Sequence, residues 1–252
     1  GTITVVAKGV GFEVTTFRRD VRTDGRRADV EFSEDVAEDA RRRDFTLNAL
    51  YATPQGLLVD PLGGLPDLLA RRVRFIGDPH DRIREDYLRI LRFFRFTAWY
   101  GGDDGIEPEG LAACAELADG LDGLARERIG AEMRKLLAAP DPAPAVAAMA
   151  AAGILARCLP GAVPALLAPL VHAEGEAGAE PDWLVRLVAI GGEDPGQALR
   201  MSRADSKALA ALRGLAAAPV PVATAAHDHG DHWCTGGGDG FEQIDLPTDE
   251  LE

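Results

Sequence analysis

The fold is decided by one stretch, residues 81–100, which reads DRIREDYLRILRFFRFTAWY. Its apolar residues stand at positions 83, 87, 90, 91, 94 and 98, which places them on one stripe of a helix. A stripe of this length can pack against other helices. The spacing therefore predicts a helix over residues 81–100 with one face in a hydrophobic core.

The opposite face of this predicted helix carries charges of both signs. Glu85, Asp86, Arg89 and Arg92 follow one another at helical spacing, so they share one surface. A carboxylate accepts from an exocyclic amine and arginine donates to ring nitrogens or carbonyl oxygens, so such a set can pair with the edge of a base. The alternative is a solvated face of ion pairs, each worth about 0.3–0.5 kcal/mol. On spacing alone the ion pairs are the commoner case.

A second charged cluster runs from Arg41 to Asp44, with Asn48 following four residues later. Three consecutive guanidinium groups suit phosphate, and an aspartate can accept a hydrogen bond from a ribose hydroxyl. The alternative is a basic helix end at the surface, which is again the commoner case on spacing alone.

The chain before residue 81 predicts a small antiparallel sheet with one helix. Strands are expected over residues 2–7, 12–17, 29–32 and 57–59, and the first two form a hairpin. Turns or loops are expected over residues 8–11, 18–27 and 60–67. A helix follows Ser33, whose side chain suits the N-cap.

Beyond residue 100 the pattern is helical, and the predicted fold class is α+β: a small antiparallel sheet with a helix, then an all-α remainder. Further helices are expected over residues 107–119, 124–138, 142–152, 181–190 and 204–217. Residues 219–252 have little periodicity and are expected to be disordered.

Two groups of side chains are candidate metal ligands. Glu13 alternates with apolar neighbours in the second strand, but an exposed strand glutamate is the commoner explanation. The cluster His227–His232 lies in the glycine-rich tail, where adventitious binding is the better interpretation.

The net charge of −14 is distributed unevenly. Residues 1–100 hold 17 Lys and Arg against 16 Asp and Glu, whereas residues 101–252 hold 10 against 25. The arginines are concentrated where phosphate contacts are expected, and the acidic remainder argues against a large non-specific affinity for RNA.

Hydropathy and cysteine content favour a cytoplasmic protein without a membrane partner. No apolar run approaches the roughly 20 residues that span a bilayer. Cys114, Cys158 and Cys234 form neither a disulfide framework nor a paired zinc motif.

Residues 13–100 resemble the head and neck of class II tRNA nucleotidyltransferases and bacterial poly(A) polymerases. Five motifs in the family's order carry the resemblance: EVTTFR at 13–18, EDARRRDFTLNAL at 38–50, DPLGGLPDL at 60–68, REDYLR at 84–89 with Arg92, and LARERIGAE at 124–132. The resemblance to the family's body fades beyond about residue 170.

The resemblance implies a domain organisation. Residues 1–56 would form a partial nucleotidyltransferase head, and residues 57–80 would connect it to the neck. Residues 81–140 would form a helical neck that selects nucleotide and binds RNA. A helical body over residues 141–218 and a tail over residues 219–252 would follow.

The resemblance also implies residue roles. Glu13 and Asp44 match catalytic positions, with Glu13 as a metal ligand, and Arg126 and Arg128 lie in the RNA-binding neck. The nucleotide-binding positions are Arg43, Asp44, Asn48, Glu85, Asp86, Arg89 and Arg92. The implied reaction is attack of a tRNA 3′-hydroxyl on the α-phosphate of CTP or ATP, assisted by two Mg²⁺ ions.

One element of the family pattern has no counterpart here. The family's Asp-x-Asp metal pair lies upstream of the strand with which this chain begins, and no such motif follows in a strand context. Glu13 and Asp44 alone do not hold two Mg²⁺ ions. We therefore expect an N-terminally truncated chain that binds nucleotide poorly and does not catalyse.

Two alternatives accompany the tRNA nucleotidyltransferase hypothesis. A poly(A) polymerase or A-adding enzyme shares these motifs, although the acidic C-terminal part favours tRNA as the substrate. A non-catalytic RNA-binding fragment fits the missing metal pair but has no need of a face that reads bases.

Overall fold

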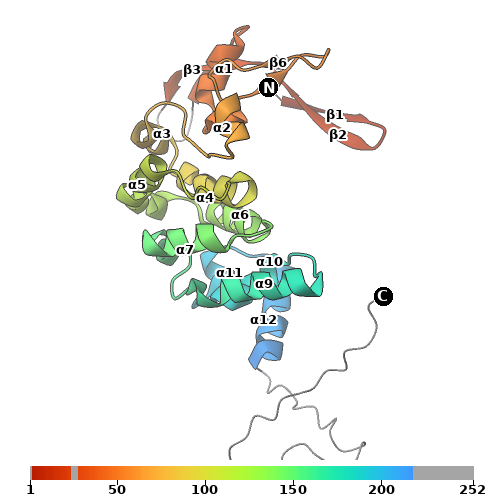
Figure 1. Cartoon of the computed structure of the whole chain (residues 1–252), viewed down its shortest axis with the longest axis vertical. Coiled ribbons are helices and arrows are strands. Elements are labelled where there is room, and N and C mark those ends of the chain that lie inside the picture. Colours follow the sequence, from red (N-terminus) through yellow and green to blue (C-terminus); the bar gives the residue numbers. More distant parts are fainter. Residues whose placement is uncertain (1, 24–27, 218–252) are drawn as a thin grey trace, which may run out of the picture. The chain divides into compact units, whose positions relative to one another are not determined.

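The computed structural model describes residues 2–23 and 28–217, with no side-chain detail for residues 19–23 and 28–31 (Figure 1). Residues 1–216 form one unit of the chain, and every feature discussed below belongs to it. The tail predicted over 219–252, its histidine cluster and Cys234 lie outside the described residues. Within the described part, no helix is long and apolar enough to cross a bilayer.

The predicted hairpin is present as β1 (Thr2–Ala7) and β2 (Val10–Thr15). The turn is shorter than expected, because Lys8 and Gly9 alone adopt positive φ values of 52° and 80°, which suit a two-residue hairpin turn. Ile3 faces Val14 and Val5 faces Phe12, so one side of the hairpin is entirely apolar. These side chains are exposed in the described structure.

Further strands form two small ladders. They are β3 (Arg18–Thr23) with β4 (Ala28–Phe32), and β5 (Tyr51–Ala52) with β6 (Leu58–Val59). The strand expected over 29–32 is confirmed, and the one over 57–59 is confirmed with a shorter length. The loop expected over 18–27 is wrong in its first part, because pairing with β4 overrides the low strand propensity of the charged residues there.

The first helix, α1 (Val36–Arg42), begins two residues later than Ser33 suggested. Asp35 is the N-cap, and its side chain accepts from Ala37 N over 2.8 Å. Ser33 instead donates to Glu38 and accepts from the backbone of Asp35. A short 3₁₀ turn, η1 (Thr46–Asn48), and α2 (Leu65–Leu69) follow.

The helix expected over residues 81–100 is wrong as a single element. The structure has α3 (Pro79–Glu85) and α4 (Leu88–Tyr100), separated by Asp86 in an extended conformation with φ −156° and ψ 106°. The Asp86 side chain accepts from Leu88 N, at the first residue of α4, over 3.1 Å, and Tyr87 is the N-cap of that helix. Glu85 and Asp86 therefore belong to two different elements.

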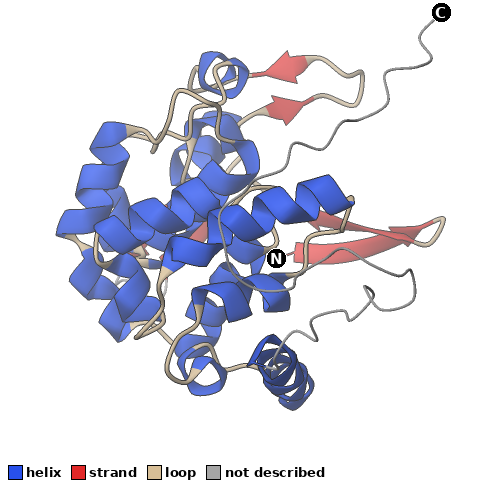
Figure 2. Ribbon diagram, turned by 60° about the horizontal axis from the view of Figure 1, so that its bottom comes forward, coloured by secondary structure: helices blue, strands red, loops and turns tan. Residues whose placement is uncertain are grey.

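The remainder is helical (Figure 2). Its helices are α5 (Pro108–Glu116), α6 (Arg126–Leu137), α7 (Ala143–Ala151), α8 (Ile154–Cys158), α9 (Leu167–Ala177), α10 (Trp183–Ile190), α11 (Pro195–Ala198) and α12 (Arg203–Ala217). Two 3₁₀ turns, η2 (Ala118–Gly123) and η3 (Pro164–Leu166), connect them. The five helices predicted here are confirmed within a few residues, except that the first ends earlier and continues as η2. The sequence analysis missed α8, α9 and α11.

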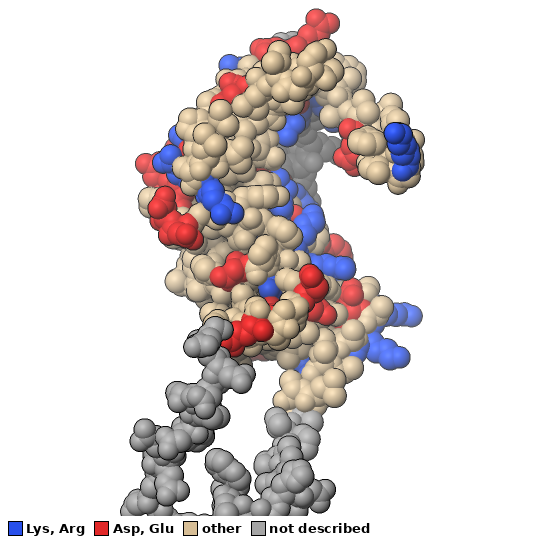
Figure 3. Space-filling view, turned by 45° about the vertical axis from the view of Figure 1, so that its right-hand side comes forward, with Lys and Arg blue, Asp and Glu red and all other residues tan. Residues whose placement is uncertain are grey.

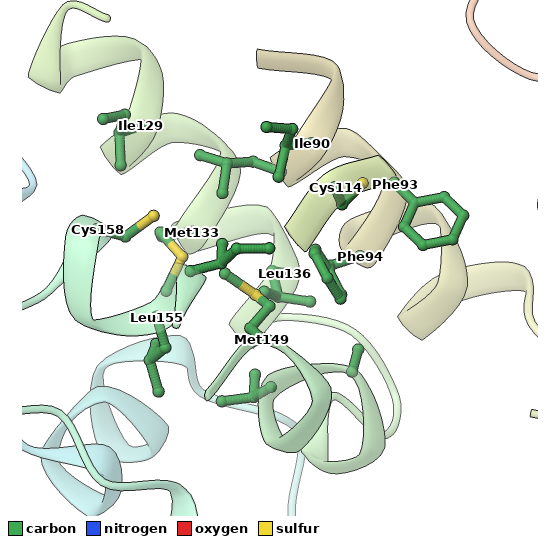
Figure 4. Packing of buried hydrophobic residues seen from close by; sticks show 14 of the residues in the cluster. Ile90, Phe93, Phe94, Cys114, Ile129, Met133, Leu136, Met149, Leu155 and Cys158 are labelled. Carbon is green, nitrogen blue, oxygen red and sulfur yellow. The ribbon is translucent and has the colours of Figure 1, made fainter. Parts of the chain in front are cut away.

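The hydrophobic core lies where α4, α6 and α7 pack together (Figure 4). Phe94 is fully buried there, as the stripe on residues 81–100 predicts, and Leu136 of α6 is buried as well. The Phe93 ring stacks on Phe75 at 5.3 Å, which ties α4 to the segment that pairs with Phe45. Through these rings the N-terminal motif is fixed against α4.

Candidate nucleotide-selecting site

Asp44 is the centre of a buried polar network. Its side chain is 6% exposed and accepts from Arg92 Nε over 2.5 Å and from Asn48 Nδ2 over 3.0 Å. Burial alone raises the pKa of this carboxyl, but the Arg92 guanidinium and these hydrogen bonds outweigh it and hold the pKa below its ordinary value. Three of the predicted nucleotide-binding residues therefore meet in one place.

Arg43 turns away from Asp44 toward Tyr51. Its Nε donates to Tyr51 Oη over 3.1 Å, and Tyr51 Oη donates to Asp39 Oδ2 over 2.8 Å. Another guanidinium nitrogen donates to the carbonyl of Asn48 over 3.1 Å. Burial, followed by the hydrogen bond to Asp39, raises the pKa of Tyr51. The phenol therefore remains neutral: it donates to Asp39, accepts from Arg43, and so fixes the position of Arg43.

Arg82 and Arg89 connect the α3–α4 region to the end of α1. Arg82 donates to the carbonyls of Arg42 and Arg43 over 2.8 and 2.5 Å, and Arg89 donates to that of Arg42 over 3.3 Å. Both guanidinium groups also bind one oxygen of Glu85 at 2.5 Å. The two charged clusters of the sequence, forty residues apart, thus form one continuous polar site.

Asp86 contacts a different part of the chain from Glu85. Its Oδ2 accepts from Arg128 on α6 over 2.7 Å, and the two side chains are 32% and 44% exposed. The predicted RNA-binding pair is divided as well, because Arg126 donates to the carbonyl of Arg157 over 2.9 Å. The structure therefore brings Arg128 to the α3–α4 junction and directs Arg126 elsewhere.

A buried aspartate anchors the connector to the 44–46 segment. Asp67 is 1% exposed and accepts from Thr46 Oγ1 over 2.6 Å. It also pairs with Arg74 at 2.7 Å and with Arg72 at 3.0 Å. Burial raises the pKa of Asp67, but the Thr46 hydrogen bond and the two arginines lower it by more, so the net shift is downward. This network holds Thr46 and, next to it, the backbone of the Asp44 motif.

The described residues do not form a metal centre. Glu13 is exposed on β2 opposite Thr4, and no hydrogen bond or ion pair among the described side chains joins it to Asp44. Asp44 is itself engaged by Arg92. Among the side chains that the structure describes, no three His, Cys, Asp or Glu residues gather to hold a metal ion.

The charged side chains of the site pair donors with acceptors: Arg92 with Asp44, Arg89 with Glu85, and Arg128 with Asp86. On the face in Figure 3, Lys and Arg lie beside Asp and Glu over the described surface. Such alternation suits recognition of the polar edge of a small molecule better than non-specific attraction of a phosphate backbone.

Two residues that organise this site, Arg82 and Tyr51, are not among those predicted from the sequence. Arg82 stands three residues before Glu85, a helical ion-pair spacing that could have revealed it. Tyr51 gave no such signal, because its contacts with Asp39 and Arg43 depend on the turn after η1.

Two family models match the sequence. The "Poly A polymerase head domain" matches residues 1–74, and the "Probable RNA and SrmB- binding site of polymerase A" matches residues 105–166.

Curated relatives point to the same family. Over 138 residues the chain is 50% identical to the mitochondrial CCA tRNA nucleotidyltransferase 1 of Danio rerio, covering 54% of this chain and 32% of that protein. Over 143 residues it is 45% identical to the CCA-adding enzyme of Lacticaseibacillus paracasei, covering 56% of this chain and 35% of that enzyme. The chain thus spans about a third of the length of these relatives.

A solved structure agrees with this match over more of the chain. The CCA-adding enzyme of Bacillus stearothermophilus in complex with CTP superposes with a TM-score of 0.70 and 31% identity, covering 88% of this chain and 56% of the other. The motifs, the α+β fold and these relatives agree: over the matched segments the chain is similar to CCA-adding tRNA nucleotidyltransferases and poly(A) polymerases.

Proposed function

We propose that this chain is the nucleotide-selecting part of a tRNA nucleotidyltransferase that adds CMP and AMP from CTP and ATP to a tRNA 3′ end. One observation carries the proposal. Arg92 binds Asp44, and Arg89 binds the carbonyl of Arg42, so the sugar-binding and base-binding motifs of the family form one site. The CCA-adding relatives support tRNA as the acceptor.

The chemistry of the bases explains why carboxylates suit this selection. Cytosine carries an amine at N4 and adenine carries one at N6, whereas uracil and guanine present a carbonyl oxygen at the corresponding place. An ionised carboxylate accepts from an amine but repels a carbonyl oxygen. Asp86 and Glu85 are the acceptors in our proposal, and Arg89 is the donor to the ring.

The other half of the site would bind the sugar of the nucleotide. In our proposal Arg43, Asp44 and Asn48 hold the ribose and the adjoining phosphate, and Arg92 keeps Asp44 ionised and oriented. Tyr51 and Asp39 fix Arg43 from behind.

The family's reaction implies Mg²⁺, and the described residues do not fit two such ions. Glu13 is exposed on the hairpin and Asp44 is paired with Arg92, so no carboxylate pair is available for a metal here. We therefore derive no catalytic step for this chain and expect weak nucleotide binding.

Ligand-observed NMR, which suits weak binding, tests the proposal. CTP and ATP should bind the purified chain more tightly than UTP and GTP, and Arg89→Ala should abolish the preference. Arg84→Ala is the matched control, because Arg84 is an exposed arginine of α3 whose ion-pair partner among the described side chains is the exposed Asp81. Equal binding of all four nucleotides by the unsubstituted chain would overturn the proposal.

A poly(A) polymerase or A-adding enzyme is the second candidate, because the matching head model carries the polymerase name. Preference for ATP alone, without CTP, would favour it. Extension of a tRNA lacking its CCA end, with CTP and ATP supplied, tests catalysis directly; we expect none from residues 1–252. The predicted domain boundaries and the cytoplasmic location remain part of this proposal.

A further inference from the structure

We infer that Arg128 is a positioning residue of the nucleotide-selecting site, which acts by holding the carboxylate of Asp86. This inference rests on the proposed function and deepens it. It replaces the RNA-binding role that the sequence suggested for Arg128.

The Asp86 carboxylate is held by two hydrogen bonds. Its two oxygens have different partners, since Oδ1 accepts from Leu88 N over 3.1 Å and Oδ2 accepts from Arg128 Nη2 over 2.7 Å. The residue lies between two helices in an extended conformation, so helical hydrogen bonding does not fix its direction. The guanidinium from α6 supplies the side-chain contact that aims the carboxylate.

The Tyr87 ring packs closely against Gly120 beside this contact. A Cβ atom on Gly120 would lie 1.9 Å from the ring of Tyr87, so the ring occupies the place of a side chain on η2. Tyr87 follows Asp86 directly. The segment from η2 to the first turn of α6 thus shapes the junction twice, through Gly120 and through Arg128.

Glu85 and Asp86 differ in the guanidinium groups that bind them. The Glu85 carboxylate receives two guanidinium groups, from Arg82 and Arg89, whose side chains are only 11% and 15% exposed. Asp86 has one guanidinium partner among the described side chains, and that partner is 44% exposed. The two carboxylates are themselves about equally exposed, 35% for Glu85 and 32% for Asp86, so they differ in the number of their guanidinium partners and not in access. Arg128 is therefore the guanidinium group on which the direction of the Asp86 carboxylate depends.

The test compares Arg128→Ala and Arg128→Lys with Arg134→Ala, an exposed arginine on the same helix. For each variant, ligand-observed NMR gives the ratio of CTP to UTP affinity and of ATP to GTP affinity, and a fluorescence titration gives the affinity for a tRNA lacking its CCA end. We expect Arg128→Ala to lower both nucleotide ratios about fivefold, the size that one partly exposed ion pair supports. Arg128→Lys should recover part of the loss, and tRNA affinity should stay within about twofold.

Each other outcome counts against the inference. Unchanged nucleotide ratios with weaker tRNA binding would return Arg128 to an RNA contact, and no change in either quantity would make the pair a surface ion pair only. If circular dichroism shows that Arg128→Ala does not fold, the test rests on Arg128→Lys. That variant must then lower the two nucleotide ratios measurably below those of the unsubstituted chain, by less than about fivefold. If the unsubstituted chain shows no preference among nucleotides, the proposed function itself fails, and a preference that Arg128 does not influence overturns only the inference.

Discussion

Arg92 on α4 donates to Oδ2 of Asp44 over 2.5 Å, across a sequence separation of 48 residues. Asp44 is almost completely buried, whereas Arg92 is 29% exposed. A buried carboxylate of this kind is costly without its partner, because water no longer solvates it. The pair therefore links the integrity of the site to the stability of the fold.

Arg92→Ala should destabilise the chain by about 3 kcal/mol, since it leaves the Asp44 carboxylate buried and unpaired. Urea unfolding followed by circular dichroism measures the change. Arg84→Ala, which removes an exposed ion pair, should stay within about 0.5 kcal/mol. A loss for Arg92→Ala no larger than the control would show that Asp44 finds another partner or water.

Acid should weaken the fold through Asp67. Because the folded-state pKa of Asp67 is lowered, its stabilising effect is complete above the ordinary aspartate pKa of about 3.9 and is lost as the pH falls through the folded value. The free energy of unfolding should therefore decrease below about pH 4. In Asp67→Asn the protein should be less stable at pH 7, and its difference from the unsubstituted chain should shrink on acidification. Urea titrations at several pH values check this, and a constant difference would contradict it.

Two glycines in helices should respond to alanine with opposite signs. In α6, a Cβ on Gly130 would lie 1.9 Å from the carbonyl oxygen of Leu199, and a backbone atom cannot swing aside. Gly130→Ala should cost about 1–3 kcal/mol despite the better helix propensity of alanine. In α12, nothing lies within 4 Å of the same position on Gly214, so Gly214→Ala should stabilise by up to about 1 kcal/mol. Thermal unfolding of both variants gives the signs, and equal signs would refute the packing argument.

Arg186 should be one of the most sensitive positions in the helical part. It is 1% exposed, donates to the carbonyls of Leu137, Ala139 and Pro140, and pairs with Glu174 at 2.7 Å. Arg186→Met should cost about 3–5 kcal/mol, because Glu174 and the carbonyls lose their donor. Adding Glu174→Gln should recover part of that loss in a double-mutant cycle. Additive losses would show that the two side chains act independently.

Periodicity predicted the helical core correctly but could not reveal the break at Asp86. Ile83, Ile90, Leu91 and Phe94 are all buried, as the stripe requires. One extended residue between two helices shifts the phase of the pattern too little to be noticed. The break depends on the hydrogen bond from Leu88 N to Asp86 and on the Tyr87 ring against η2, and the second of these is a tertiary contact.

The site was predictable in its members but not in their pairing. The positions of Asp44, Asn48 and Arg92 follow from the motifs, and the structure places them in contact. The partners of Asp86 and Arg43 do not follow, because Arg128 and Tyr51 reach them only after the chain has folded back on itself. Short helices such as α8 and α11 were missed because so few residues establish no period.

The guanidinium groups of Arg82 and Arg89 bind the backbone carbonyls of Arg42 and Arg43. Every residue type has such a carbonyl, so substitutions at 42 and 43 leave this link intact. Paired substitutions across homologous sequences, which report contacts between side chains, should therefore show little coupling between positions 82 and 43. Covariation would therefore not detect the connection between the two halves of the site, although the hydrogen bond from Arg82 to the Arg43 carbonyl, at 2.5 Å, is among the shortest in the described part of the chain.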